Sequence, residues 1–392
     1  MAVSASDAAP AAAPTGARSR SLRIALIAPV WLTVPPLGYG GTERVVSSLA
    51  EELTARGHDV TLFAVGGSLT TARLVTFLEA PPHPADPGAF ADEIFHTLSA
   101  YLHADDFDVI HDHSGFGPAM GAMLGGRPPV VQTLHGPWTV LGRRFAALVH
   151  DKVNLVAISR AQAAANPEVR YAGIIHNGID LDAYPYVHAK RDYLAYVGRA
   201  SPEKGTHLAV EVARRAGLPL KMAVKRADDA ERAYWDEVVA PRLRGDEEIY
   251  EQPPHAVKWD ILAHARATLF PIDWPEPFGL VLVESMACGT PVIARPSGAV
   301  PEIVADGTTG FLRESVDAMV DAVGHSDTLD RRQCRALVEE RFSAAVMASR
   351  YEALYTDLVD AGDGESRSVL ETGGLVDAGR FTGEPAGPKH GV

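Results

Sequence analysis

The sequence predicts an α/β protein built from two doubly wound domains that face each other across a cleft. Short apolar runs rich in β-forming residues alternate with segments of helical period, and the alternation occurs twice along the chain. The length of 392 residues also exceeds what one ordinary hydrophobic core holds. A strand–helix–strand order needs a crossover connection, so the strands should be parallel. We therefore expect a first domain over residues 22–184 and a second over residues 192–341.

The first series opens with an apolar strand over 22–29 and a loop rich in glycine and proline. A helix is expected over 42–56, because apolar residues return at helical spacing and Gly57 ends the pattern. A second strand over 58–65 completes the unit. Further buried strands are expected over 107–113, 129–136, 154–159 and 170–180.

The second series begins at Tyr193, where an apolar strand over 193–199 again runs into a glycine loop. The same alternation then continues to about residue 341. It comprises a helix over 207–217, a strand over 218–224, a helix and a strand over 261–272, a helix over 279–289 and a strand over 290–295. A last helix, over 342–359, is expected to cross back to the first domain.

Both ends of the chain are expected to be disordered. In residues 1–20 two arginines, Arg18 and Arg20, follow the alanine-rich part, which is the reverse of the charge order in a signal peptide. Residues 361–392 are rich in glycine and charged residues and lack apolar periodicity, which indicates a flexible tail.

Charge and composition exclude several classes of partner. A formal charge of −14 argues against nucleic-acid binding, which needs a broad basic surface, although a small anionic ligand needs only two or three cations. No apolar stretch reaches the ~20 residues of a membrane span. The sequence also shows no basic amphipathic helix, so stable association with a membrane surface is not expected. Cys288 and Cys334 are too few for a disulfide framework, which fits a reducing cytoplasm.

The strongest local signal is a pair of glutamates, Glu276 and Glu284, with seven residues between them. If a helix begins near Phe278, its first N–H groups have no internal partners and form a natural phosphate site. Glu284 could then accept hydrogen bonds from the vicinal hydroxyls of a ribose, and Glu276 could bind the hydroxyls of a sugar. The alternative is that Glu276 is only a favourable anion near a helix N-terminus and that Glu284 is an exposed helix residue.

A second signal is the loop from Gly198 to Gly205, directly after an apolar strand. Arg199 and Lys204 should lie at the carboxyl edge of the sheet, where open α/β folds bind ligands. Fixed cations there can neutralise a diphosphate. The alternative is a surface turn with solvated side chains.

Two further motifs complete an ordered set: Gly40-Gly41-Thr42-Glu43 after the first strand, and Ile175-His176-Asn177-Gly178-Ile179-Asp180 before the second domain. Over residues 22–360 the set resembles retaining family 4 glycosyltransferases of GT-B fold, which consist of two Rossmann-like domains. The resemblance implies a sugar transferred from a nucleoside diphosphate, with the first domain shaping the acceptor site and the second binding the donor.

The resemblance also implies a role for each matching residue. Arg199 and Lys204 match the pyrophosphate-binding pair, and Glu284 matches the carboxylate that holds the ribose. Glu276 and His113 are both expected to be catalytic, and His113 matches a histidine beside the donor sugar. The backbone groups expected to bind the donor phosphates and sugar are those of Gly40, Gly41, Phe278, Gly279 and Leu280.

Other patterns leave alternatives open. His135 and Trp138 follow a strand at the same sheet edge and could contact the acceptor, or could equally pack in a loop. The triplet His111-Asp112-His113 and the D-x-D triplets that begin at Asp106 and Asp180 suggest a metal, but two imidazoles make an incomplete zinc site, so no metal or other cofactor is expected. A dinucleotide fingerprint fails, because Glu43 stands where its third glycine should be.

The sequence thus predicts a cytoplasmic, retaining glycosyltransferase that uses a nucleotide sugar and a small polar or natural-product acceptor. A dehydrogenase and a non-catalytic sugar-nucleotide-binding protein are the alternatives. Lys225 and Arg226, and the turn from Gln252 to His255, stand where the family commonly has glycine-containing turns, which leaves the base preference open. The sugar, the acceptor and the oligomeric state are not identified by the sequence.

Overall fold

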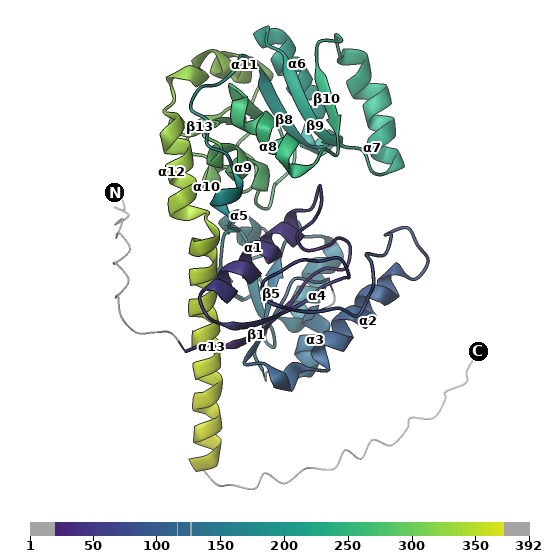
Figure 1. The fold of residues 1–392 in the computed structure, drawn as a ribbon, viewed down its shortest axis with the longest axis vertical. Coiled ribbons are helices and arrows are strands. Elements are labelled where there is room, and N and C mark those ends of the chain that lie inside the picture. Colours follow the sequence, from purple (N-terminus) through teal and green to yellow (C-terminus); the bar gives the residue numbers. More distant parts are fainter. Residues whose placement is uncertain (1–19, 116, 126–127, 372–392) are drawn as a thin grey trace, which may run out of the picture.

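The computed structural model describes residues 20–371, except residues 116, 126 and 127. Two lobes are stacked along the long axis of the molecule, each built around a parallel sheet (Figure 1). The strand order is β3-β2-β1-β4-β5-β6-β7 in the first sheet and β10-β9-β8-β11-β12-β13 in the second. This arrangement confirms the two doubly wound α/β units that the sequence predicts.

Among its described residues, the first lobe contains seven strands and the helices α1 to α5. Its strands are β1 (Arg23–Ile27), β2 (Asp59–Phe63), β3 (Arg73–Val75), β4 (Val109–Asp112), β5 (Val130–Leu134), β6 (Asn154–Ala157) and β7 (Tyr171–Ile174). Its helices are α1 (Gly41–Ala55), α2 (Ala89–Tyr101), α3 (Gly117–Met123), α4 (Val140–Val149) and α5 (Arg160–Ala164). The short edge strand β3 was not predicted from the sequence.

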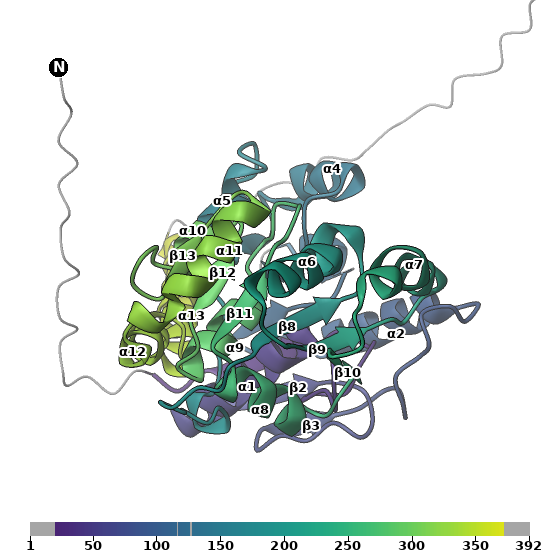
Figure 2. The same ribbon diagram turned by 90° about the horizontal axis from the view of Figure 1, so that it is seen from above.

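In the described part of the chain, the second lobe contains six strands and the helices α6 to α12. Its strands are β8 (Leu194–Arg199), β9 (Leu220–Lys225), β10 (Glu248–Glu251), β11 (Ala267–Phe270), β12 (Val292–Ala294) and β13 (Gly310–Leu312). Its helices are α6 (Thr206–Ala216), α7 (Asp229–Tyr234), α8 (His255–His264), α9 (Leu280–Ala287), α10 (Val300–Ile303), α11 (Val316–His325) and α12 (Arg331–Arg341). Seen from above, α6 and α11 lie on the outer face of this lobe (Figure 2).

Alternating apolar side chains build a core on each face of each sheet. In β1, Ile24 and Leu26 pack with α1, whereas Ala25 and Ile27 pack on the opposite face with residues of α2 and α4. Because successive side chains of a strand point to opposite faces, a fully apolar strand requires helices on both sides. The continuous apolar runs in the sequence therefore explain the three-layer architecture of both lobes.

The strand order places two topological switch points beside the space between the lobes. In the first sheet the order reverses between β1 and β4, and in the second between β8 and β11. The connections that leave neighbouring strands there diverge to opposite faces, which opens a crevice at the carboxyl ends of the strands. The loops after β1, β8 and β11 carry the glycine, cationic and acidic residues selected from the sequence.

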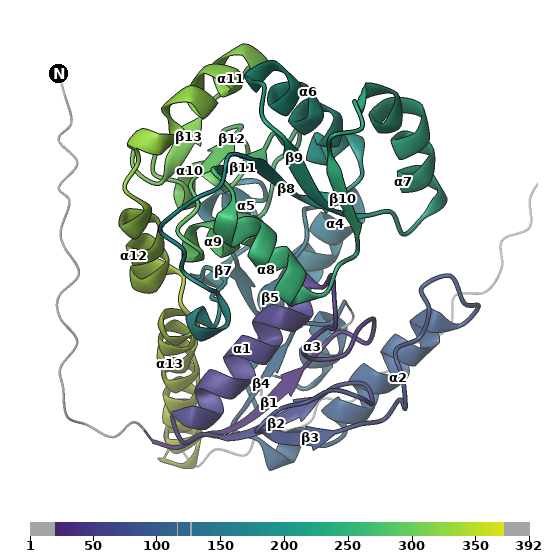
Figure 3. The same cartoon turned by 45° about the horizontal axis from the view of Figure 1, so that its top comes forward.

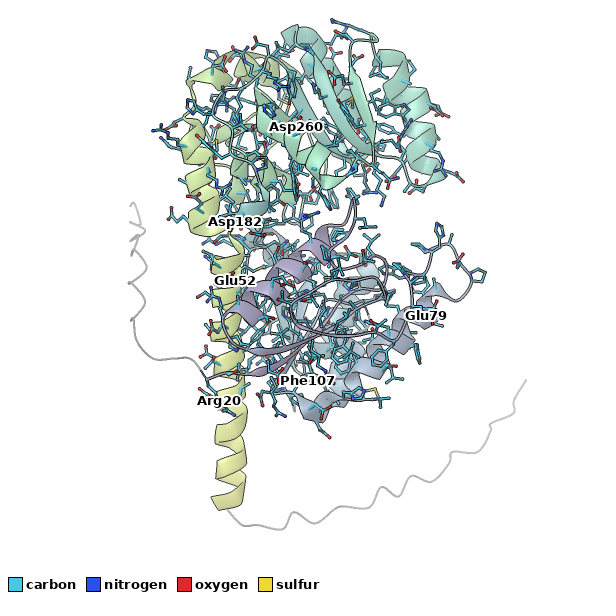
Figure 4. All side chains as sticks on the ribbon, in the orientation of Figure 1. Arg20, Glu52, Glu79, Phe107, Asp182 and Asp260 are labelled. Atoms are coloured by element: carbon cyan, nitrogen blue, oxygen red, sulfur yellow. The ribbon has the colours of Figure 1, made fainter. Side chains whose placement is uncertain are left out.

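The last helix, α13 (Ala344–Glu371), follows α12 of the second lobe and runs along the first lobe, where it packs beside α1 (Figure 1). Two chain crossings between the lobes lie side by side: the N–H of Ile179 donates to Phe342 O at 2.9 Å, and the N–H of Ala344 donates to Ile179 O at 2.8 Å. Figure 4 labels Asp182, which lies close to this junction.

The helix continues to Glu371, so the tail expected from residue 361 begins inside it. The segment from 361 to 371 contains no proline, so no residue in it prevents the preceding helix from continuing. The rest of that tail, and residues 1–19 of the expected extension, lie outside the described residues. None of the helices in the described part of the chain has the length and apolar character of a membrane span.

Candidate active site

The segment between β11 and α9 forms the floor of the site. Phe278 is buried in the core of the second lobe and fixes this segment, and α9 begins two residues later, after Gly279. The first N–H groups of a helix have no partners within the helix, so the start of α9 presents free donors together with the positive end of the helix dipole. This is the geometry that the sequence predicts for a phosphate site.

Gly298 fixes the backbone of Glu276. Gly298 has a φ of +60°, and a Cβ atom there would lie 2.3 Å from the carbonyl oxygen of Glu276 and 2.4 Å from its nitrogen. The N–H of Ala299 donates to that carbonyl at 2.8 Å. Only glycine permits this close approach, so Gly298 is a positioning residue that the sequence reasoning did not select.

The side chain of Glu276 is held by two donors. Lys204 Nζ donates to its Oε2 at 2.5 Å, and the indole N–H of Trp274 donates to the same oxygen at 2.8 Å. The ammonium of Lys204 also lies 4.6 Å from the centre of the Trp274 ring, at cation–π distance. The loop after β8 and the loop after β11 are thus joined through a buried charge pair.

Arg199 lies at the end of β8 and is oriented by two carboxylates. Its Nη2 donates to Glu203 at 2.9 Å and its Nη1 donates to Glu231 at 3.2 Å. Gly205 closes this loop with a φ of +67°, and a Cβ there would lie 2.0 Å from Pro271 O. This contact explains the glycine at the end of the motif, because any side chain would push the loops after β8 and β11 apart.

Glu284 lies in α9 and is only 2% exposed, so the alternative of an exposed helix residue is wrong. Lys258 Nζ donates to both of its oxygens, at 2.7 and 2.9 Å, the hydroxyl of Tyr184 donates at 3.1 Å, and Arg44 Nε lies 3.9 Å away. Burial alone would raise the pKa of Glu284, but the charges of Lys258 and Arg44 outweigh it and hold that pKa below its ordinary value. The carboxylate is therefore ionised at neutral pH.

The first lobe contributes the start of α1. A Cβ on Gly41 would lie 3.2 Å from Leu280 Cδ1, which shows how closely the N-termini of α1 and α9 approach across the lobes. Figure 3 shows α1 directed at the second lobe, where α8 and α9 lie. Two helix N-termini from different lobes thus face one space, which doubles the local preference for an anion.

One cavity of about 370 Å³ brings these groups together. The predicted donor residues that line it are Gly40, Gly41, Arg199, Lys204, Glu276, Phe278, Gly279, Leu280 and Glu284, and His135 lines it as well. Arg199 and Lys204 line this cavity and both are paired with carboxylates, so the alternative of a turn with solvated side chains is wrong.

His113 and Trp138 do not line that cavity. They line a second cavity of about 290 Å³, which shares His135 and Pro137 with the first. Nδ1 of His113 lies 2.8 Å from Nε2 of His135, so His113 is separated from the donor cavity by the other imidazole. The indole N–H of Trp138 donates to Gln162 O at 3.0 Å, and its ring forms part of the wall.

His111 is a structural residue. Both of its ring nitrogens are engaged, with Tyr355 at 2.6 Å and with Thr133 at 2.7 Å, in a polar network that ties α13 to the first sheet. These contacts leave no ring nitrogen for a metal. Among the residues that the structure describes, His, Cys, Asp and Glu side chains form no cluster of metal-binding size.

Several cavity residues were missed by the sequence reasoning. Arg44, Lys258 and Trp274 line the cavity, and Tyr184 lies behind Glu284. Arg44 also contacts His255 and stacks 5.5 Å above Trp259, so α1 touches α8 directly across the lobes. Arg44 adjoins the glycine motif and could have been selected from it, whereas Lys258 lies in a helix without any motif.

Comparison with protein families agrees with this architecture. A model of glycosyltransferase family 4 matches residues 39–183, and a model of glycosyl transferases group 1 matches residues 186–325. Each model covers one lobe, in the order in which the lobes occur along the chain.

Curated relatives span most of the chain. The N-acetyl-alpha-D-glucosaminyl L-malate synthase of Bacillus anthracis is 25% identical over 371 residues, covering 82% of this chain and 94% of that protein. The phosphatidyl-myo-inositol mannosyltransferase of Mycolicibacterium smegmatis is 28% identical over 358 residues, covering 83% and 89%. Both matches cover more than four fifths of this chain and therefore extend over both lobes.

Solved structures resemble the chain at similar coverage. AviGT4, a glycosyltransferase involved in avilamycin A biosynthesis, is 26% identical with a TM-score of 0.67, covering 86% of this chain and 98% of its own. HepE of Anabaena, solved in complex with UDP and glucose, is 20% identical with a TM-score of 0.67, covering 86% and 99%.

The fold and the cavity between the lobes define a glycosyltransferase of GT-B fold. The chain belongs to family 4 of these enzymes. The dehydrogenase and the non-catalytic binding protein, which the sequence left open, are set aside by this membership.

Proposed function

We propose that the enzyme transfers a sugar from a nucleoside-diphosphate sugar to a hydroxyl group of a small polar or natural-product acceptor, with retention at the anomeric carbon. The observation that carries the proposal is the charge pattern of the 370 Å³ cavity: two helix starts and several cationic side chains, Arg199 and Lys204 among them, line one space together with the carboxylates of Glu276 and Glu284. A diphosphate is the ligand that this pattern fits best.

The donor would lie along the cavity in a defined direction. Arg199, Lys204 and the N-termini of α1 and α9 would hold the diphosphate, and Glu284 would accept hydrogen bonds from the ribose. Glu276 lies in the loop before the start of α9, where it would bind the sugar hydroxyls or stabilise positive charge at the anomeric carbon. Lys204 now holds Glu276, so donor binding would draw this ammonium toward the phosphates.

Retention follows if the acceptor attacks from the face that the leaving group vacates. The departing phosphate can itself take the acceptor proton, so the reaction depends on stabilising that phosphate rather than on a dedicated base. The cations and helix starts supply this stabilisation inside a crevice that closure of the lobes would dry. They also supply the positive charge that a metal would otherwise bring, so we expect transfer to continue in the presence of EDTA.

Related proteins support a nucleotide-sugar donor. HepE was solved with UDP and glucose, and the names of other relatives include mannosyl and N-acetylglucosaminyl transfer. The acceptors in those names differ from one another, so they leave the acceptor of this enzyme open. Cys288 and Cys334 are both buried and free, which agrees with the reducing cytoplasm that we propose as its location.

A panel of nucleotide sugars tests the proposal. A bound donor should raise the thermal midpoint of unfolding, since a ligand at a hundredfold excess over its Kd adds about 2.7 kcal/mol to stability. The products of the best donor should show the same anomeric configuration as the donor by NMR. An inverted product would contradict retention, and no response to any nucleotide sugar would contradict the donor class.

Substitutions at the cavity complete the test. Lys204→Ala and Glu276→Ala should abolish transfer while the protein remains folded. Lys221 is a matched control, because it lies at the opposite end of β9 from the cavity and pairs with Glu248. Near-normal turnover in either cavity variant would count against the proposal.

A further inference from the structure

The second cavity has one apolar wall. Phe145, Ala146 and Val149 of α4 line it together with Leu155 of β6, and Trp138 adds an aromatic face. Its volume of about 290 Å³ is close to that of the smaller ligand pockets, roughly 300 Å³. Such a wall favours an apolar ring or a short alkyl group over a fully hydrated polyol.

The lining of the same cavity also includes two residues with polar atoms that have no partner among the described residues. Gln132 is 3% exposed; its amide N–H donates to Ser114 O at 2.9 Å, but its Oε1 has no partner among the described residues. His113 is 5% exposed, and its Nε2 likewise has none in the described chain. A buried polar atom without a partner costs about 1–3 kcal/mol, so a ligand hydroxyl that reaches either atom after a small movement of its side chain would gain a favourable hydrogen bond.

The cavity is electrically neutral. Its described lining contains no lysine and no arginine. Burial holds the pKa of His113 well below its ordinary value and lowers the pKa of His135 to about 4, so both rings are uncharged near pH 7. A phosphate or carboxylate placed here would lose its hydration without meeting a cation.

Position links this cavity to the reaction. His135 and Pro137 line both cavities, so a molecule in the second cavity would reach toward the sugar end of the first. His113 and His135 share one hydrogen bond, whose donor is one ring or the other, so Nε2 of His113 can serve as donor or acceptor according to the tautomer. Either form can bind a hydroxyl group.

We infer that the second cavity binds the acceptor, and that the acceptor is an uncharged hydroxyl compound with an apolar ring or short alkyl group rather than a phosphorylated or carboxylated one. The apolar part would lie against α4, and the hydroxyl side would face Gln132 and His113. This inference rests on the proposed function, because it assigns the substrate of the same reaction.

Pairs of acceptors test each part of the inference. With the best donor of the panel, the aryl glycoside 4-nitrophenyl glucoside should exceed glucose by about tenfold or more in kcat/KM, which measures the apolar contribution. Glucose should in turn exceed glucose 6-phosphate, which measures the effect of charge. Hydrolysis of the donor by water is followed in parallel, since a compound that fills the cavity slows hydrolysis even when it is not itself glycosylated.

A charge placed in the wall should reverse the second preference. Phe145→Lys should lower the ratio of glucose to glucose 6-phosphate by about tenfold or more. Leu148→Lys is the matched control, because Leu148 lies in the same helix, is 78% exposed and is not part of the cavity lining. If Phe145→Lys fails to fold, Gln132→Met serves instead, and it should raise the Michaelis constant for the aryl glycoside by a larger factor than it lowers kcat.

The outcomes separate this inference from the function on which it rests. Preference for glucose 6-phosphate in the unmodified protein, or aryl compounds that neither accept sugar nor slow donor hydrolysis, would overturn the inference while leaving donor use intact. A shift in Leu148→Lys equal to that in Phe145→Lys would also overturn it. A protein that neither binds nor hydrolyses any nucleotide sugar would overturn the proposed function first, and the inference with it.

Discussion

Glu276 and Glu284 each pair with a lysine at the same cavity, yet their surroundings differ. Glu284 is held by Lys258 and Tyr184, with Arg44 nearby, and it lies deep in the second lobe. Glu276 is held at one oxygen by Lys204 and Trp274. It lies in the loop before α9 and not within the helix. One carboxylate is fixed before any ligand arrives, whereas the other shares its lysine with the predicted phosphate site.

The difference separates binding from chemistry. A rigid, ionised carboxylate suits a ribose, whose hydroxyl groups do not change during the reaction. A carboxylate whose partner can turn toward a phosphate suits the reacting end, where charge develops. The comparison predicts that changes at Glu276 act mainly on rate, and that changes around Glu284 act mainly on stability and donor affinity.

The largest effect is expected from Glu276→Gln. This change keeps the shape but removes the charge beside the reacting carbon, so kcat should fall by roughly 10² to 10³. Steady-state kinetics at saturating donor measure it. The KM for the donor should change by a smaller factor, and a loss confined to KM would reverse the roles assigned to the two glutamates.

The next effect is expected from Lys258→Met. It leaves the buried carboxylate of Glu284 without its main partner, which should cost about 3 kcal/mol of the free energy of unfolding. Urea unfolding measures this loss. Lys204→Met is the comparison variant and should cost less stability, because Glu276 keeps Trp274 and stands at the cavity edge; equal losses would remove the distinction.

Acid should weaken the contribution of Glu284. Its pKa is lowered in the folded protein, so the ionised carboxylate stabilises the fold above its ordinary pKa of 4.5, and this stabilisation is lost as pH falls through the folded pKa. The difference in free energy of unfolding between wild type and Glu284→Gln should therefore shrink as pH falls from roughly 6 toward 3. Urea titrations across that range measure it, and a constant difference would contradict the assignment.

The smallest effect is expected from Arg44→Leu. Arg44 reaches Glu284 only at 3.9 Å and spans the lobes through Trp259 and His255, so stability should change by less than about 1 kcal/mol. The KM for the donor should still rise a few-fold, because a charge is lost at the ribose site. Isothermal titration with the nucleoside diphosphate alone would show whether this loss is in binding; an unchanged Kd would exclude Arg44 from the site.

Local pattern predicted those residues whose position follows from the order of strands. Arg199, Lys204, Gly40 and Gly41 come directly after buried strands, and the carboxyl ends of parallel strands lie at one edge. Family resemblance then supplied a role for each. The edge strands β3, β10 and β13 were missed because they are short, and the Glu248–Glu251 segment is also too polar to show a buried pattern.

Contacts between distant segments were not predictable in this way. Lys258 and Tyr184 meet Glu284 from segments 26 and 100 positions away, and neither lies in a recognised motif. His113 was expected beside the donor sugar, but it lines the second cavity, and His135, directly after β5, is the histidine that lines the first. The role of each residue toward a ligand stays a prediction until a complex or a variant tests it.

The paired crossings at Ile179 and Phe342–Ala344 determine how the lobes can move. The two covalent connections lie side by side and are joined by backbone hydrogen bonds, so they can act as a hinge. Such a hinge permits rotation of one lobe about the line of the crossings and resists sliding of the lobes past each other. A Cβ on Gly178 would lie 2.5 Å from Ser343 O, so a larger residue there would force the two crossing segments apart. The width of the opening between the lobes therefore depends on the angle between them. That angle is set at the crossing segments, away from the cavity.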